Sequence, residues 1–225
     1  NYKGNITITD TPTLAQLKSI NDATSGTITL QDSSFALTGS TADIKAALAG
    51  TITTHTGTVT ISDAAATDIT ATDIATINST TTGVITVTNA VDINGSGSEV
   101  AAAFAAIDTN TGNAAATITG NDYTVAQLKS INDATTGAIT LSTTNTNLTG
   151  TAADLVSAFA GTITTHTGDI TITDTPTDAQ LAIIDAATTG TISYESGGGG
   201  GGGDEEITGT SAQVIEALQS KSDYT

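Results

Sequence analysis

The feature that most constrains this chain is an internal repeat. The segment from Gly26 to Gly57 returns almost unchanged from Gly137 to Gly168, and both copies end in TITTHTG. A shorter segment, TLAQLKSINDATSG at Thr13, recurs as TVAQLKSINDATTG at Thr124 and as TDAQLAIIDAATTG at Thr177. Repeats of this size cannot bury an apolar face alone, so they are stable only when neighbouring copies stack. The repeat therefore predicts a solenoid.

Helix starts define the repeating unit. At eight places, roughly 27 residues apart, a Ser or Thr is followed three residues later by an acidic residue or Gln. This is the capping-box pattern, in which the hydroxyl accepts from one free amide of the first helical turn and the later side chain binds another. We predict helix caps at Thr13, Ser40, Thr70, Ser96, Thr124, Thr151, Thr177 and Thr210.

Apolar anchors after each cap distinguish two kinds of unit, which we call A-type and B-type. In A-type units the two anchors are three residues apart, and in B-type units they are four apart, so both pairs lie on one helix face. The A-type anchors are Leu17 and Ile20, Ile74 and Ile77, Leu128 and Ile131, and Leu181 and Ile184. The B-type anchors are Ile44 and Leu48, Val100 and Phe104, Leu155 and Phe159, and Val214 and Leu218.

Between the helices the pattern changes to an alternation of Ile and Thr, which is typical of half-buried strands. We predict a first strand after each helix, as in TITL at Thr27 and VITV at Val84, and a second strand before the next cap, as in ITIT at Ile6 and LTG at Leu148. Each strand is expected to pair with its equivalent in the next unit, in parallel ladders spaced about 4.8 Å apart.

These signals together predict an α/β solenoid of about eight coils, each made of strand, turn, strand and short helix. The coils form a single domain over residues 1–225, with a flexible Gly-rich loop at residues 197–203. Helices are expected to end in the left-handed conformation at a set of recurrent glycines, because this conformation carries no steric penalty for Gly. The set is Gly26, Gly50, Gly83, Gly137, Gly161 and Gly190.

Charge excludes several classes of partner. Asp and Glu total 23 against 5 Lys and Arg, which gives a net charge of −18. Nucleic acids and anionic membrane surfaces attract basic patches, so neither is an expected partner. Cysteine is absent, which excludes disulfides and thiolate ligands. No apolar run approaches the roughly 20 residues that a membrane-spanning helix needs, so membrane insertion is not expected.

Candidates for chemistry are few. His55 and His166, both within THTG, are interpreted as solvated turn residues whose replacement should leave stability unchanged. Asp10, Asp63 and Asp174 follow second strands of A-type units, where Asp can form a turn or interact with a helix dipole. No nucleophile, base and acid come together by any spacing argument. We therefore predict no enzyme, no catalytic residue, no cofactor and no metal site, with calcium left open as an alternative.

A resemblance adds a cellular context. The units ITITDTPTDAQLAIIDAATTG and LTGTAADLVSAFAGTITTHTG resemble repeats of very large secreted surface proteins of marine bacteria and cyanobacteria. The acidic, cysteine-free composition, rich in Thr, Ala and Gly, is similar to that of bacterial surface-layer proteins and adhesin stalks. The resemblance implies an exported extracellular protein with a scaffolding or adhesive role.

Two functions are compatible with these patterns. The first is an extracellular structural protein, a filament, surface-layer or adhesin-stalk component, that assembles head to tail or as part of a longer array. In such an assembly Ile6 and Ile8 of one copy would stack near Ile207 of the next, because open strand edges favour pairing with another chain. The alternative is an ice- or carbohydrate-binding module that uses outward Thr rows. Those rows, Thr7 and Thr9, Thr58 and Thr60, and Thr171 and Thr173, are expected to be interrupted in B-type units at Leu37, Ile93 and Leu148.

Overall fold

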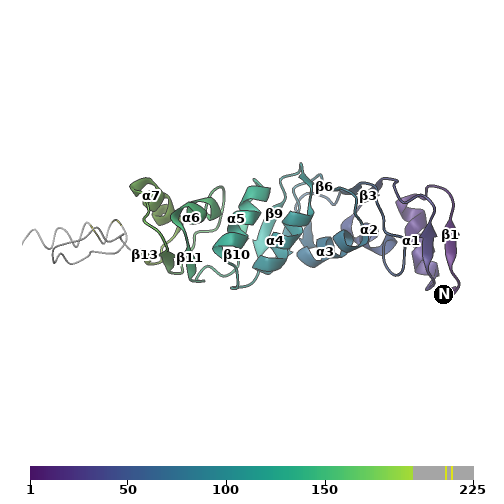
Figure 1. Cartoon of the computed structure of the whole chain (residues 1–225), viewed down its shortest axis with the longest axis horizontal. Coiled ribbons are helices and arrows are strands. Elements are labelled where there is room, and N and C mark those ends of the chain that lie inside the picture. The colour runs from purple at the N-terminus through teal and green to yellow at the C-terminus, as the bar shows by residue number, and fades with distance from the viewer. Residues whose placement is uncertain (195–210, 212–213, 215–225) are drawn as a thin grey trace, which may run out of the picture.

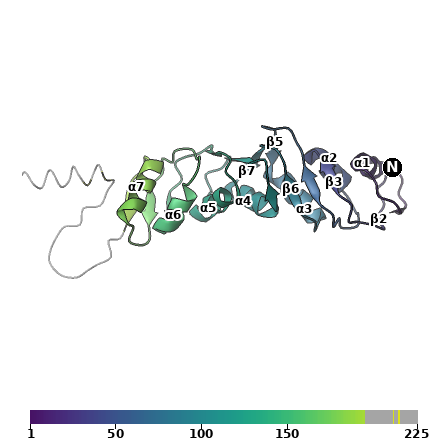
Figure 2. The ribbon, with the colours of Figure 1, turned by 90° about the horizontal axis from the view of Figure 1, so that it is seen from above.

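The computed structural model describes residues 1–194 together with Ser211 and Val214. This part of the chain is a mixed α/β protein in which helices and strands follow one another along an elongated body (Figure 1). The same end-to-end order is seen after a quarter turn about the long axis (Figure 2). The Gly-rich loop at residues 197–203, Ile207 and the cap at Thr210 lie outside the described residues.

Seven helices are described, and each follows a predicted cap. They are α1 (Leu14–Ala23), α2 (Thr41–Ala47), α3 (Ala71–Thr80), α4 (Gly97–Ala106), α5 (Val125–Ala134), α6 (Ala152–Ala158) and α7 (Asp178–Ala187). In all seven the cap hydroxyl accepts from the backbone N–H of the third helical residue. The reciprocal bond of a complete capping box is present at Thr13, Ser96, Thr124 and Thr177. The predicted caps are therefore confirmed throughout the described part.

The described strands form four parallel sheets. The first sheet consists of β1 (Ile6–Ile8) and β2 (Ile28–Leu30). The second contains, in order, β3 (Leu37–Gly39), β4 (Val59–Ile61), β6 (Ile85–Val87) and β8 (Thr109–Asn110). The third contains β10 (Ile139–Leu141), β9 (Ala115–Ile118), β7 (Asp92–Gly95) and β5 (Asp68–Thr70). The fourth contains β11 (Leu148–Gly150), β12 (Ile170–Ile172) and β13 (Ile192–Tyr194).

The expected pairing of equivalent strands holds only in part. Second strands do pair with second strands where a B-type unit meets the next A-type unit, as β3 does with β4 and β11 with β12. Around every A-type helix, however, the strand that leaves the helix pairs with a strand that precedes it. These pairs are β1 with β2 across α1, β4 with β6 across α3, β9 with β10 across α5, and β12 with β13 across α7. Each is a crossover through a helix between parallel neighbours.

A recurrent Thr-x-Gly joint explains this pairing. At the end of α3 the hydroxyl of Thr81 donates to the carbonyl of His55, 3.0 Å away, and accepts from the amide of Gly83 at 2.9 Å. The joint recurs at Thr24, Thr135 and Thr188. In each case the residue whose carbonyl accepts this bond lies just before the strand that precedes the helix. The bond therefore holds the strand that follows the helix beside that earlier strand.

The glycine of this joint is needed for close approach and not for a left-handed turn. Among the described glycines only Gly50 and Gly161 have a positive φ, of 72° and 71°. These two follow the B-type helices α2 and α6, where the prediction of left-handed ends is confirmed. A Cβ atom at Gly83 would lie 1.7 Å from the carbonyl oxygen of Gly57. The prediction is therefore wrong for the glycines that follow A-type helices.

The division into four short sheets has a physical reason. Each described helix packs on the next, and packed helices lie about 8–10 Å apart. Strands in a ladder are only about 4.8 Å apart. Each unit contributes one helix to the stack, so neighbouring units are held farther apart by their helices than a strand ladder allows. Unless the stack bends sharply, one unbroken ladder cannot run along its whole length. The ladders therefore end after a few strands, and new ladders begin beside them.

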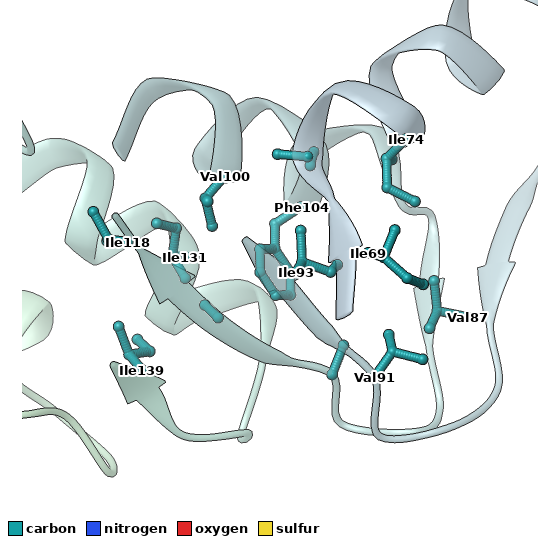
Figure 3. Packing of buried hydrophobic residues seen from close by; sticks show 14 of the residues in the cluster. Ile69, Ile74, Val87, Val91, Ile93, Val100, Phe104, Ile118, Ile131 and Ile139 are labelled. Carbon is teal, nitrogen blue, oxygen red and sulfur yellow. The ribbon is translucent and has the colours of Figure 1, made fainter. Parts of the chain in front are cut away.

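The core runs along the whole described body between strands and helices. Alternate strand residues and the helix anchors form one buried cluster, including Ile69, Ile93 and Ile118 from strands and Val100 and Phe104 from α4 (Figure 3). The predicted second-strand anchors Leu37, Ile93 and Leu148 are all buried. Most of the apolar anchors are thus buried between neighbouring units.

Candidate interaction surfaces and the buried histidines

The N-terminal face of the body is formed by β1 and α1. Within the described residues β1 pairs on one edge only, with β2. Ile8 is 7% exposed and packs into the core, whereas Ile6 is half-buried. Beside them lies a groove of about 390 Å³, lined by Ile8, Pro12 and Ile20 together with Asp10. The predicted assembly residues Ile6 and Ile8 therefore lie together at this face, and Ile207 lies outside the described residues.

The same face recurs in the interior, where it is covered. β4 and β12 occupy the place of β1 in the second and fourth sheets, and their outer edges pair with β3 and β11. The B-type helices α2 and α6 pack on the A-type helices α3 and α7 of the following units. The face formed by β1 and α1 is thus a copy of an interface between two units of this chain.

The aspartates that follow these strands bind the neighbouring unit. Oδ2 of Asp63 accepts from both the amide and the hydroxyl of Thr41, each at 2.7 Å, at the start of α2. Oδ1 of Asp174 accepts from the amide of Ala152 at 2.8 Å, at the start of α6. Both carboxylates thus interact with a helix N-terminus, which was one of the two roles predicted for these aspartates. The helix, however, belongs to the preceding unit. Asp10 occupies the matching position after β1 and is exposed.

The interpretation of the histidines as solvated turn residues is wrong. His55 is 0% exposed. Its Nε2 lies 2.7 Å from the carbonyl oxygen of Phe35, so the N–H on that nitrogen donates to it, and Nδ1 lies 3.3 Å from Oγ1 of Thr81. The ring packs edge-on against Phe35 with centroids 5.1 Å apart. Desolvation by burial lowers the pKa of His55, because the charged form is disfavoured away from water.

His166 repeats this arrangement with one difference. It is also 0% exposed, and its ring packs against those of Tyr123 and Phe159, with centroids 6.3 and 5.7 Å away. Its Nδ1 is 3.4 Å from Oγ1 of Thr188, whereas its buried Nε2 has no hydrogen-bond partner among the described residues. Burial lowers the pKa of His166 as well. Both rings are therefore core residues.

A sequence signal for these buried rings was present and was missed. The residues His55, Gly57, Val59 and Ile61 alternate with exposed or half-buried neighbours and are all buried. The period of two that identified β4 therefore begins before the strand, at the histidine. THTG has the composition of a polar turn, and that composition concealed the alternation.

Outward threonines form single rows across the sheets. Thr38, Thr60, Thr86 and Thr109 are in register across β3, β4, β6 and β8. A shorter row joins Thr149, Thr171 and Ser193 across β11, β12 and β13. The pairs of Thr in A-type units are therefore reduced to one Thr in β3 and β11, as expected, and a single row continues through these strands. In β7, however, Asn94 stands in the equivalent row between Thr70 and Thr117.

Two clefts between helices repeat with the sequence. One, of about 560 Å³, is lined by Lys18, Ser19, Asp22 and Asp43, and the other, of about 400 Å³, by the equivalent residues Lys129, Ser130, Asp133 and Asp154. In the first, Lys18 forms an ion pair with Asp43 of the next helix at 2.6 Å, and in the second Lys129 pairs with Asp133 at 3.2 Å. The lysine thus neutralises one of two nearby carboxylates.

Other classes of site are not found in the described part of the chain. No group of three or more His, Asp or Glu residues there could hold a metal ion. No helix there is both long and apolar enough to cross a membrane. No protein-family model, curated protein or solved structure matches this chain. The geometry of the interaction surfaces is therefore the basis for a functional proposal.

Proposed function

We propose that the chain is a repeat solenoid of eight coils and serves as an extracellular structural protein. It would be a component of a filament, a surface layer or an adhesin stalk, and it would assemble through the ends of the solenoid. The observation that carries this proposal is the stack of repeated units in the described part, in which each helix packs on the next and the buried residues form one continuous cluster. An open strand edge beside an apolar groove favours pairing with another chain.

The repeat supports the number of coils. Seven capped helices follow one another in the described part, and each packs on the next. The sequence from Thr210 to Gln213 repeats the capping pattern once more. Because each unit contacts only its neighbours, such a stack is extended by adding units without changing those already present.

The extracellular location rests on composition and resemblance. A net charge of −18 keeps a long assembly soluble through mutual repulsion. A chain without cysteine is indifferent to the oxidising conditions outside the cell. The resemblance to repeats of large secreted surface proteins supports the same location.

The test of assembly uses the unmodified chain and a variant of its N-terminal edge. We expect the unmodified chain to form filaments visible by electron microscopy, and Ile6→Lys combined with Ile8→Lys to remain a monomer in sedimentation. Charged residues on an edge strand block its pairing with another chain. Circular dichroism should show that the variant stays folded, and Thr60→Lys, at the outward position of the interior strand β4, is the matched control. Filaments formed by the double variant would contradict assembly through β1.

The axial repeat of the filament gives a second measurement. Eight helices packed about 8–10 Å apart predict a repeat of roughly 64–80 Å per molecule. A rise set only by strands about 4.8 Å apart would give roughly 38 Å. Because consecutive helices are in contact, we expect the longer value.

The alternative, an ice- or carbohydrate-binding module, is favoured by the row of Thr38, Thr60, Thr86 and Thr109. Four in-register hydroxyls on parallel strands form a regular array about 4.8 Å apart. Thermal hysteresis of the unmodified chain, lost on Thr60→Leu and Thr86→Leu, would support ice binding. Its absence would leave the structural role as the proposal.

A further inference from the structure

We propose that the outward face of the second sheet pairs side by side with the same face of a second copy of this chain. We call it the neutral face, and it consists of two rows, Thr38, Thr60 and Thr86, and Ala36, Thr58 and Val84. The inference goes beyond assembly through the ends, because β3 and β6 lie along the side of the body (Figure 1). It rests on the proposed structural role and specifies a second contact between copies.

Both rows follow from the period of two along the strands. Leu37, Val59 and Ile85 are in register across β3, β4 and β6, and all three are buried in the core. The residues on either side of them therefore point outward. Four of the six outward side chains are exposed and the other two are half-buried. Val84 is 48% exposed and is one of three large apolar side chains that are exposed among the described residues.

The neutral face carries no charge in a chain whose net charge is −18. Two copies repel each other wherever their carboxylates meet, so they approach most closely through a surface that has none. Asp108 borders the face directly before β8, and its Oδ2 accepts from the amide of Ile85 at 2.8 Å. A cationic partner would be attracted to the acidic remainder of the surface. The charge distribution therefore favours a second copy as the occupant of this face.

The matching face of the fourth sheet shows that this neutrality is specific to the second sheet. The positions of Ala36, Thr58 and Val84 are taken there by Asn147, Asp169 and Thr191. All three are exposed, and Asp169 is charged. Oδ1 of Asn147 accepts from the amide of Asp169, and Oδ1 of Asp169 accepts from the amide of Thr191, both at 3.1 Å. The two sheets thus differ at positions that face outward, where packing of the core imposes no choice.

The side chains of the neutral face suit the packing of one sheet on another. Two sheets pack face to face about 10 Å apart with interdigitated side chains. The methyl groups of Thr, Ala and Val supply apolar contact, and each hydroxyl both donates and accepts hydrogen bonds. Because both copies offer the same surface, the contact closes around a two-fold axis.

The size of the neutral face sets the strength of the contact. It covers three short strands, which is far less than the roughly 800 Å² per partner that a stable dimer buries. We therefore expect a weak contact between free molecules. It becomes effective when many copies are aligned in one assembly, because linked contacts act together.

The absence of cysteine permits a crosslinking test. Thr60→Cys places a thiol in the central strand of the face, and Thr171→Cys places one at the equivalent position of β12. Under oxidised glutathione we expect disulfide-linked dimers of Thr60→Cys to form at least tenfold faster than those of Thr171→Cys. Thr171 is the more exposed of the two, so accessibility alone would favour the control. Equal rates would overturn the pairing of neutral faces.

Sedimentation separates the neutral face from the ends of the solenoid. The chain with Ile6→Lys and Ile8→Lys, monomeric when dilute, should form dimers as its concentration approaches about 1 mM, the range of weak contacts. Adding Val84→Asp should raise the dissociation constant at least tenfold, because it places a charge on the face. Adding Thr191→Asp, at the equivalent exposed position before β13, should leave it unchanged. Circular dichroism checks that each variant is folded.

The outcomes distinguish this inference from the proposed function. Filaments of the unmodified chain together with equal crosslinking rates would overturn the neutral-face contact alone. Fast crosslinking through Thr60→Cys without filaments would overturn end-to-end assembly alone. Thermal hysteresis that Val84→Asp abolishes, in a chain that does not dimerise, would assign the face to ice and overturn self-pairing.

Discussion

α1 and α5 contain the same sequence, AQLKSINDA, and differ in what surrounds them. Ile131 of α5 is fully buried, whereas the equivalent Ile20 of α1 is only half-buried. The difference comes from the neighbouring unit: α4 packs on α5, and no described helix packs on the corresponding side of α1. In this protein the environment of a side chain is therefore set by the adjacent copy as much as by its own segment.

The largest expected effect is on an interior strand. Leu148→Asp places a carboxylate in the core, at a position of β11 that is 2% exposed. Burial of an unpaired charge is very costly, so we expect the free energy of unfolding to fall by at least about 4 kcal/mol. Urea denaturation followed by circular dichroism measures it. Thr149→Asp, on the exposed face of the same strand, is the control and should change little. A Leu148→Asp chain that unfolds like the parent would show that this position is outside the core.

The comparison of α1 with α5 is tested by one substitution made in each. Ile131→Ala should lower the free energy of unfolding by about 2–5 kcal/mol, the range for deleting a buried Ile side chain. Ile20→Ala should cost less in the monomer, because part of the side chain is already in water. If assembly covers Ile20, the two costs should become similar under assembling conditions. Equal costs in the monomer would contradict the difference in burial.

The two buried histidines should make the free energy of unfolding depend on pH. Burial lowers the pKa of both His55 and His166 below the value of about 6.5 that applies in the unfolded chain. As the pH falls through 6.5, the unfolded chain therefore binds more protons than the folded chain, and the free energy of unfolding decreases. We expect the urea midpoint to fall between pH 7.5 and pH 5.5.

The matched variant is His55→Gln with His166→Gln. It should be less stable than the parent at pH 7.5, because both rings fill buried sites, but it should show little change between pH 7.5 and pH 5.5. The carboxylates with a lowered pKa, such as Asp43 and Glu99, lose their contribution only at more acidic pH. A parent chain whose stability is constant over this range would contradict the burial of the histidines.

The smallest expected effect concerns the ion pair between Lys18 and Asp43. Hydrogen bonding to Asp43 raises the pKa of Lys18 and lowers that of the carboxyl group. Both side chains are substantially exposed, at 39% and 47%, so solvent and salt screen the attraction. Lys18→Ala should leave the melting temperature unchanged within experimental error at about 0.15 M salt. A clear loss of stability would show that the cleft beside α1 contributes more to the junction than its exposure indicates.

Local signals in the sequence were sufficient to predict the helices. The capping residues and the paired anchors act within one turn of chain, so Thr13 with Gln16, or Leu128 with Ile131, identifies a helix and its buried face without knowledge of the neighbours. The described part bears out seven of the eight predicted caps, and the eighth lies outside it.

Strand partners could not be predicted in the same way. ITIT in β1 and TITL in β2 have the same alternation, and neither contains a residue that specifies its neighbour. The choice depends on the Thr-x-Gly joint at Thr24 and on the unequal spacing of packed helices and paired strands, which are properties of the assembled stack. For the same reason the helices bound by Asp63 and Asp174 lie in the preceding unit, where spacing along the chain gives no indication of them.

The overlap of the four sheets has a mechanical consequence. Where the first sheet ends, near Ile52, the second already joins β3 to β4, and where the third ends, near Ile163, the fourth joins β11 to β12. No cross-section through the described body is therefore free of strand pairing. A tensile force along the axis meets hydrogen bonds loaded in succession at every junction, with a single three-residue ladder at the steps from β1 to β2, β9 to β10 and β12 to β13. Stretched between its ends, the molecule should rupture stepwise, one junction at a time, beginning at a junction that is joined by a single ladder.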